Sequence, residues 1–168
     1  MIMQGKSQYK FCPSCATSLQ NTLVDGTQRL TCPNCGFIFW DNPKPTTSII
    51  LAKESKVLLL KRSQEPFKGY WVLPGGYVEH DEDPQVTIVR ETKEETGLHV
   101  IIRGIVWVYL IDTDPRGNSI DIVFEGTISG GAMTLREHAR ANFFAPNKLP
   151  EIIAYRHREA IAIWQNRP

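Results

Sequence analysis

The sequence predicts an α+β protein in which a small cysteine-rich module precedes a larger mixed domain. Two C-x-x-C pairs mark the module, whereas β-branched runs divided by turn residues and one well-capped helix pattern mark the domain. A length of 168 residues suits one module joined to a compact domain. The composition, 42% hydrophobic and 22% charged, is near the globular average, so disorder, collagen and coiled coil are excluded.

The four cysteines form two pairs, Cys12 with Cys15 and Cys32 with Cys35, with sixteen residues between the pairs. This spacing is typical of a zinc site with four thiolate ligands, which leaves no open coordination position and is therefore structural. The alternatives are a disulfide and a thioredoxin-like redox pair. In a reducing cytoplasm, paired C-x-x-C motifs hold metal more often than they form disulfides.

The segment 9–40 contains too little apolar mass to fold unaided, so zinc ligation is expected to supply the missing free energy. Asp25-Gly26 predicts a hairpin turn within it. The start of the chain, residues 1–6, has no apolar run typical of a secretory signal, and no later stretch reaches the ~20 apolar residues of a membrane span. A cytoplasmic location is therefore expected.

A stiff connector follows, because two prolines within residues 41–45 disfavour both helix and sheet pairing. We therefore place the zinc module at 1–41 and a second domain at 42–168. Aliphatic and β-branched runs bounded by turn residues predict the strands of this domain, the first two joined as a hairpin. They are residues 47–52, 57–60, 98–111 and 120–128. A stretch that opens at Pro150 and contains Ile152, Ile153, Ile161 and Ile163 predicts a terminal helix.

The clearest helix covers residues 84–96. Asp83 is a good N-cap, Pro84 suits the first helical position, and Gly97 suits a left-handed end. Successive residues are rotated by about 100°, so three glutamates share one face while an adjacent sector packs inward. The glutamates are Glu91, Glu94 and Glu95, and the inward sector is Val86, Val89 and Thr92.

Three like charges on one helix face repel, and a hard divalent cation bound by carboxylate oxygens would compensate. A solvated acidic face is the alternative. The residues before the helix favour the cation, because the segment 76–98 matches the Nudix box at Gly76, Glu82, Arg90, Glu91, Glu94, Glu95, Gly97 and Leu98. The chain thus resembles a Nudix hydrolase, which implies a Nudix α/β/α sandwich with a mixed sheet. Thr92 departs from the usual aliphatic residue without removing a ligand.

The resemblance implies that Mg²⁺ or Mn²⁺ is the catalytic cofactor. Its ligands would be Gly75, Glu79, Glu91, Glu94 and Glu95. Arg90 would pair with Glu82 and hold the loop against the helix. Water would attack one phosphorus while the cation neutralises the developing charge, and the family's variable general base would be Glu94 or Glu137.

Four residues outside the box are candidates for substrate binding. Lys61 and Arg62 are the nearest cations for phosphate, with plain surface as the alternative. Tyr70 and Trp71 precede the glycine pair, where aromatic rings stack on nucleobases or pack in the core. His138 is expected at the surface, and the other histidines show no partner pattern.

The cysteine pairs followed by Asn42-Pro-Lys44 resemble the zinc-ribbon branch of the family, which includes NADH pyrophosphatases and plant FAD or ADP-ribose pyrophosphatases. The resemblance implies cleavage of a pyrophosphate bond in such a substrate, with release of a nucleoside monophosphate. A strict NADH enzyme is disfavoured because residues 98–104 replace that group's Ser-Gln-Pro-Trp-Pro-Phe run. The alternatives are an RNA cap-removing enzyme and a ligand-sensing regulator, although a regulator would be expected to have degenerate glutamates.

The net charge of +1 shows no bulk preference for nucleic acid or membrane. Residues 75–98 contain seven acidic and two basic residues, so the rest of the chain carries +6. An acidic cradle within a basic surround suits a small-molecule nucleotide that meets cations at the box. Related enzymes are often dimers, so a homodimer is expected by analogy, and nucleic acid is the less favoured partner.

Overall fold

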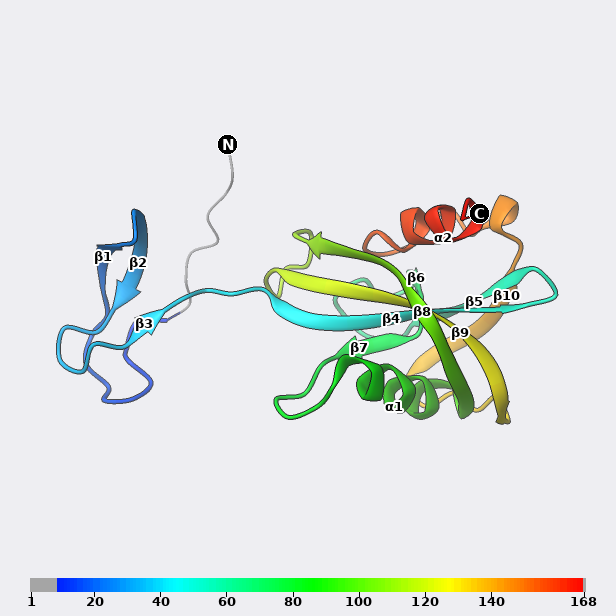
Figure 1. The fold of residues 1–168 in the computed structure, drawn as a ribbon, viewed down its shortest axis with the longest axis horizontal. Coiled ribbons are helices and arrows are strands. Elements are labelled where there is room, and N and C mark those ends of the chain that lie inside the picture. Colours follow the sequence, from blue (N-terminus) through cyan, green and yellow to red (C-terminus); the bar gives the residue numbers. More distant parts are fainter. Residues whose placement is uncertain (1–8, 168) are drawn as a thin grey trace. The chain divides into compact units, whose positions relative to one another are not determined.

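The computed structural model describes residues 9–167. The chain divides into two compact units, Met1–Asn42 and Pro43–Pro168, whose elements are shown in Figure 1. Residues 1–6, which lack a signal-like run in the sequence, lie outside the described part. No helix in the described part is long and apolar enough to cross a membrane.

The first unit is a small antiparallel sheet of β1 (Gln20–Val24), β2 (Thr27–Thr31) and β3 (Ile38–Phe39). Asp25 and Gly26 join β1 to β2 with positive φ angles of 47° and 77°, as a tight hairpin turn requires. The predicted hairpin is confirmed. Within residues 9–41 only Cys12 and Cys32 are buried, so this unit lacks an apolar core.

The second unit is built on one mixed sheet. Its strands are β4 (Lys44–Lys53), β5 (Lys56–Arg62), β6 (Trp71–Val72), β7 (Gly75–Tyr77), β8 (Leu98–Ile111), β9 (Ser119–Gly131) and β10 (His138–Phe144). The order is β10-β5-β4-β9-β8, with β6 paired to β5 and β7 to β4. Only β4 and β9 run parallel among the described pairs. The helices α1 (Pro84–Thr96) and α2 (His157–Gln165) cover opposite faces, which confirms the α/β/α sandwich (Figure 1). A 3₁₀ turn, η1 (Pro146–Lys148), follows β10.

The predicted β4–β5 hairpin and the predicted acidic helix are also confirmed. Glu54 and Ser55 form the β4–β5 turn with positive φ angles of 50° and 60°. Asp83 caps α1 by accepting the Gln85 N–H at 2.8 Å, and Gly97 ends the helix at a φ of 71°. Local turn and capping chemistry therefore sets the limits of these elements.

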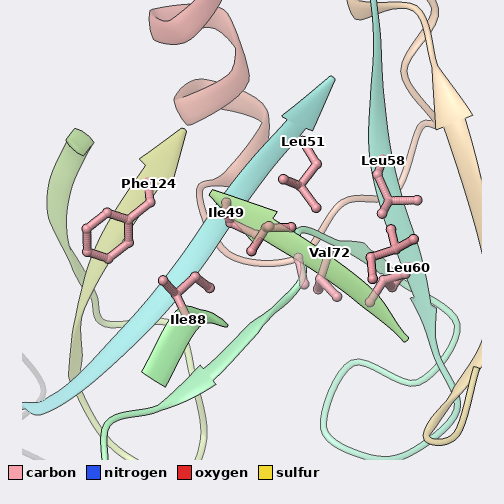
Figure 2. Packing of buried hydrophobic residues seen from close by; sticks show 10 residues of the cluster. Ile49, Leu51, Leu58, Leu60, Val72, Ile88 and Phe124 are labelled. Carbon is pink, nitrogen blue, oxygen red and sulfur yellow. The ribbon is translucent and has the colours of Figure 1, made fainter. Parts of the chain in front are cut away.

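The core consists of two apolar clusters, one on each face of the sheet. Ile88 of α1 packs with Ile49 and Leu51 of β4, and Figure 2 shows this cluster. Ile50 belongs instead to the cluster on which Ile161 of α2 packs. Successive residues of a strand point to opposite faces, so β4 supplies both clusters and fixes α1 against the sheet.

The predicted inward face of α1 is partly wrong. Val86 is 58% exposed, whereas Ile88, Thr92 and Thr96 are fully buried. These three residues repeat every fourth position and form the stripe that meets the sheet. Val86 lies two residues, or about 200°, from Ile88, and therefore faces away.

The predicted start of the terminal helix is also wrong, because α2 begins at His157 and not near Pro150. Ile153 forms a parallel bridge with Trp71, and the Ala154 N–H donates to the Trp71 carbonyl at 2.9 Å. Tyr155 has a positive φ of 58°, which is incompatible with a helix. The residues before α2 thus extend the sheet edge at β6.

Candidate functional site

A cavity of about 350 Å³ opens beside α1 in the second unit. It is bordered by β4, β5 and β7, by the loop between β8 and β9, and by the segment that leads into α2. Its acidic lining residues are Glu65, Glu79, Glu91, Glu95, Asp114, Asp121 and Glu137. Of the three helix glutamates, two thus face the cavity and Glu94 does not.

Gly75 and Gly76 bring the backbone of β7 against the helix carboxylates. A Cβ at Gly76 would lie 2.4–2.7 Å from the carboxyl atoms of Glu91. A Cβ at Gly75 would lie 2.0 Å from the carbonyl oxygen of Thr47. A side chain at Gly75 would clash with the backbone of β4, and one at Gly76 would displace the Glu91 carboxylate, so the glycine pair forms a cradle for Glu91. The atoms in this cradle that could bind a metal ion are carboxylate and carbonyl oxygens, which hard cations such as Mg²⁺ and Mn²⁺ prefer.

Glu95 is held at both carboxylate oxygens. The Gly75 N–H donates to Oε2 at 3.0 Å, and His138 Nε2 lies 2.7 Å from Oε1. Glu95 is 8% exposed, and the side chain of His138 is 6% exposed. The prediction of a surface position for His138 is wrong, because the first residue of β10 turns inward beside α1.

Arg90 links the loop before α1 to the helix. Its Nη2 and Nε donate to Glu82 at 2.8 and 2.9 Å, and its Nη1 donates to Glu91 and Glu94 at 2.9 and 3.0 Å. The hydrogen bonds from Arg90 lower the pKa of Glu82 to about 2. Glu82 therefore stays ionised and paired, which fixes the loop that carries Glu79.

Glu91 is a helix glutamate whose ionised form is disfavoured by its surroundings. Burial raises its pKa, and the charges of Glu95 and Glu94 raise it further, against the opposing effect of Arg90. The ionised form is therefore unfavourable unless a cation shares the site. Glu94 differs, because its side chain is 54% exposed.

The four predicted substrate-binding residues separate in the structure. Arg62 lines the cavity, whereas its strand neighbour Lys61 lies with Nζ 5.9 Å from the centroid of the Trp71 ring. Trp71 packs edge-on against Phe144 with ring centroids 4.8 Å apart. Tyr70 is 37% exposed and, like Lys61 and Trp71, lies outside the cavity lining.

The cavity also contains an arginine clamp at Arg116, a cation that the sequence offers as comparable to Lys61 and Arg62 but does not place. Asp114 is 7% exposed and accepts from Arg116 Nη2 at 2.7 Å. The same guanidinium reaches Tyr155 Oη at 3.2 Å and lies over the Tyr77 ring, 5.5 Å from its centroid. Although burial raises the pKa of Asp114, the Arg116 contacts hold it below its usual value. The sequence signal was Asp-Pro-Arg within a turn, where an aspartate side chain accepts the N–H two residues on.

One feature that sequence reasoning missed is a buried polar network at the start of α2. His157 Nδ1 accepts the Leu73 N–H at 2.9 Å, which leaves the ring proton on Nε2, 3.1 Å from Ser48 Oγ. Ser48 Oγ donates in turn to Asp121 at 3.0 Å. The network ties α2, β4 and β9 to the segment that leads into Gly75.

The first unit gathers the four cysteine thiols into one cluster. The sulfur–sulfur distances are 3.4 Å for Cys15–Cys32, 3.5 Å for Cys12–Cys35 and 3.6 Å for Cys15–Cys35. All four sulfurs lie within 4.8 Å of one another, and all are free thiols. A tetrahedron with zinc–sulfur bonds of about 2.3 Å has edges of ~3.8 Å, so the cluster fits zinc. Hydrogen bonds with Thr17 lower the pKa of Cys15 to about 5. Although its backbone hydrogen bond with Phe37 lowers the pKa of Cys35, its contacts with the other three thiols outweigh that effect and raise the pKa to about 12.

Both units match known families. Residues 42–163 match the family described as NUDIX domain, and residues 10–41 match the one described as Nudix N-terminal. The ADP-ribose pyrophosphatase of Methanocaldococcus jannaschii is 42% identical over 122 residues, or 71% of this chain and 72% of that protein. The NAD-capped RNA hydrolase NudC of Stutzerimonas stutzeri is 28% identical over 162 residues, or 93% of this chain and 54% of that protein.

A solved structure of similar extent supports the same assignment. A NUDIX hydrolase from Nitrosomonas europaea has a TM-score of 0.80 at 28% identity, covering 94% of this chain and 92% of that one. Together with the box residues around the cavity, these similarities identify the fold and the family. The chain belongs to the Nudix hydrolase family.

Proposed function

We propose that this chain is a Mg²⁺- or Mn²⁺-dependent pyrophosphohydrolase for a nucleoside diphosphate linked to another group, of the ADP-ribose, FAD or NADH type. The product would be a nucleoside monophosphate. The convergence of Glu91, Glu95 and the glycine cradle in one cavity carries this proposal. Its similarity over most of its length to an ADP-ribose pyrophosphatase supports the substrate class.

The cation would be held by the Gly75 carbonyl and by Glu79, Glu91 and Glu95, which line the cavity. Glu94, the fourth glutamate expected as a ligand, lies outside the lining and is not needed for this arrangement. When bound, the cation supplies charge neutralisation at phosphate and lowers the pKa of an attacking water. Glu82 and Arg90 keep the loop against α1. As general base we favour Glu137 over Glu94, because Glu137 lines the cavity and Glu94 lies outside it.

The substrate, a linked nucleotide, would lie along the cationic and aromatic part of the cavity lining. Arg62 offers a guanidinium for phosphate, and Arg116 is already fixed by Asp114. Tyr77 and Tyr155 flank Arg116 and offer ring faces for a base or a sugar. Lys61, Tyr70 and Trp71 are not needed for this arrangement.

We also propose that residues 1–41 form a zinc ribbon with a structural Zn²⁺ and that residues 42–168 form the hydrolase domain. Cys12, Cys15, Cys32 and Cys35 would be the zinc ligands. A second candidate function is removal of an NAD-type cap from RNA. Similarity to a NAD-capped RNA hydrolase over 93% of this chain, including the cysteine module, favours that candidate.

A substrate panel tests both functions. Zinc-loaded protein with Mg²⁺ is offered ADP-ribose, FAD, NADH, NAD and NAD-capped RNA, and the products are identified by mass spectrometry. Release of AMP from a free dinucleotide or ADP-ribose supports the first candidate. Turnover of capped RNA far above that of free NAD supports the second. Absence of hydrolysis with every substrate would contradict both and favour a ligand-binding role.

Gly76→Ala is expected to lower turnover by about a hundredfold while the fold persists. The added methyl meets only the flexible end of Glu91, so little backbone must move, but a misplacement of about 1 Å at a reacting centre costs ~10²-fold. Gly104→Ala is the matched control, because a Cβ there has no neighbour within 4 Å. Measured turnover that is equal in the two variants would contradict the role of the cradle.

A further inference from the structure

His138 contacts a helix glutamate from a distant part of the chain. It begins β10, 43 residues after Glu95, and is one of the residues that line the cavity. An ionised carboxylate only accepts hydrogen bonds, so the proton between His138 Nε2 and Glu95 Oε1 resides on the ring. The Gly75 N–H donates a hydrogen bond to the other carboxylate oxygen, Oε2. Glu95 is thus fixed by one backbone donor and one imidazole donor.

Packing alone does not account for an imidazole at this position. His138 Nδ1 is buried and has no hydrogen-bond partner among the described residues, which is unfavourable for a polar atom. Further along β10, Ala141 and Phe143 pack against the apolar core. An apolar side chain at position 138 would avoid the cost of Nδ1, so the contribution of the imidazole lies in the Nε2–H directed at Glu95.

We propose that His138 is a positioning residue for the cation site of this hydrolase. It holds Glu95 Oε1 so that the carboxylate keeps one orientation relative to Glu91 and the Gly75 carbonyl, and it acts through Glu95 without touching substrate. This assignment rests on the proposed function, since it takes Glu95 as a cation ligand. Replacing a residue that hydrogen-bonds a metal ligand typically changes metal affinity by about 10–100-fold.

The test distinguishes the position of the hydrogen-bond donor at residue 138 from the mere presence of a polar side chain there. His138→Gln puts an amide nitrogen near the place of Nε2, whereas His138→Asn carries the same amide one methylene short of Glu95. Mn²⁺ binding to the zinc-loaded full chain is measured by EPR. We expect the Gln variant within about threefold of wild type and the Asn variant about tenfold weaker or more. Equal affinities of the two variants would overturn the proposal.

A double-mutant cycle tests whether the effect passes through Glu95. In a Glu95→Gln background, adding His138→Asn is expected to change Mn²⁺ affinity by less than about twofold. A further tenfold loss in that background would show an independent role and overturn the proposal. The KM for the organic substrate at saturating Mg²⁺ should stay near wild type in the Gln variant, because a residue that acts through Glu95 needs no contact with substrate.

If the Asn variant does not fold, the proposal is tested instead by NMR of the wild-type protein. Substoichiometric Mn²⁺ is expected to broaden the ring signals of His138 strongly, while Mg²⁺ only shifts them, and a ring that ignores Mn²⁺ would overturn the assignment. Failure of the proposed function has a different signature. Wild-type protein would then bind no Mn²⁺ and hydrolyse no substrate, which would overturn both proposals, whereas equal Gln and Asn variants of an active enzyme overturn this one alone.

Discussion

Exchange of Glu91 for glutamine is expected to lower hydrolysis by about a thousandfold or more. The amide has the same size and can still accept from Arg90, but it lacks the charge that a divalent cation requires. Loss of one anionic ligand removes several kcal/mol of transition-state stabilisation, and each ~1.4 kcal/mol is tenfold in rate. Measuring kcat and KM at saturating Mg²⁺ checks this expectation.

The same substitution is expected to stabilise the protein when divalent cations are absent. Burial and the neighbouring charges of Glu95 and Glu94 raise the pKa of Glu91 in the folded state. The carboxyl group therefore contributes stability that is fully present below about pH 4 and is lost as the pH rises through the raised pKa. In EDTA, the Tm of Glu91→Gln should exceed the wild-type Tm at pH 7 and converge with it near pH 4.

The matched control is Glu151→Gln, because Glu151 is exposed and lies outside the cavity lining. It should leave both turnover and Tm unchanged. Wild-type turnover in Glu91→Gln would refute the metal-ligand assignment. A lower Tm than wild type at pH 7 in EDTA would instead show that the Glu91 charge is compensated within the protein, by Arg90 alone.

The elements whose limits are set by capping or turn residues close in sequence could be predicted from the sequence. The limits of α1 follow from Asp83, Pro84 and Gly97, which act within one turn of the helix ends. The two hairpins follow from short polar turns between apolar runs. The sequence predicts that Glu91, Glu94 and Glu95 share a helix face. It does not predict that Glu94 turns to solvent, because the direction of the Glu94 side chain depends on how α1 packs on the sheet.

The missed site residues depend on contacts that no local pattern encodes. His157 meets Ser48, 109 residues earlier, and His138 meets Glu95, 43 residues earlier. A register shift between His138 and Arg140 also breaks the strict alternation of β10, so a period-two reading assigns the wrong side to its first residue. Tertiary packing alone brings these imidazoles to the cavity and to the segment before Gly75.

Removal of zinc is expected to unfold the first unit and leave the second folded. Within residues 9–41 only Cys12 and Cys32 are buried, while Phe11 and Leu23 are 60% and 68% exposed. Such a unit has no apolar core to offset the entropy of the unfolded chain. The apparent free energy of structural zinc binding, about 10–16 kcal/mol in small zinc-finger peptides, then becomes its folding free energy.

Residue-resolved ¹⁵N NMR of Cys32→Ser measures this directly. Amide signals of residues 9–41 should lose their chemical-shift dispersion. Those of residues 43–167 should keep their positions, because the second unit packs around its own core at Ile49 and Ile50. Ser14→Ala is the control, since it keeps the backbone N–H that donates to Cys12 Sγ at 3.4 Å, and it should retain one zinc per chain. Dispersed signals for residues 9–41 without zinc would contradict the prediction.

The same variant separates a structural ribbon from one that binds substrate. The cavity lies entirely within the second unit, so turnover of ADP-ribose or another small substrate should survive unfolding of the ribbon to within about twofold. Capped RNA extends beyond a cavity of about 350 Å³ and would need further contacts. Loss of capped-RNA turnover with retention of small-substrate turnover in Cys32→Ser would therefore assign the ribbon to the RNA strand, and parallel retention of both would confine its role to its own fold.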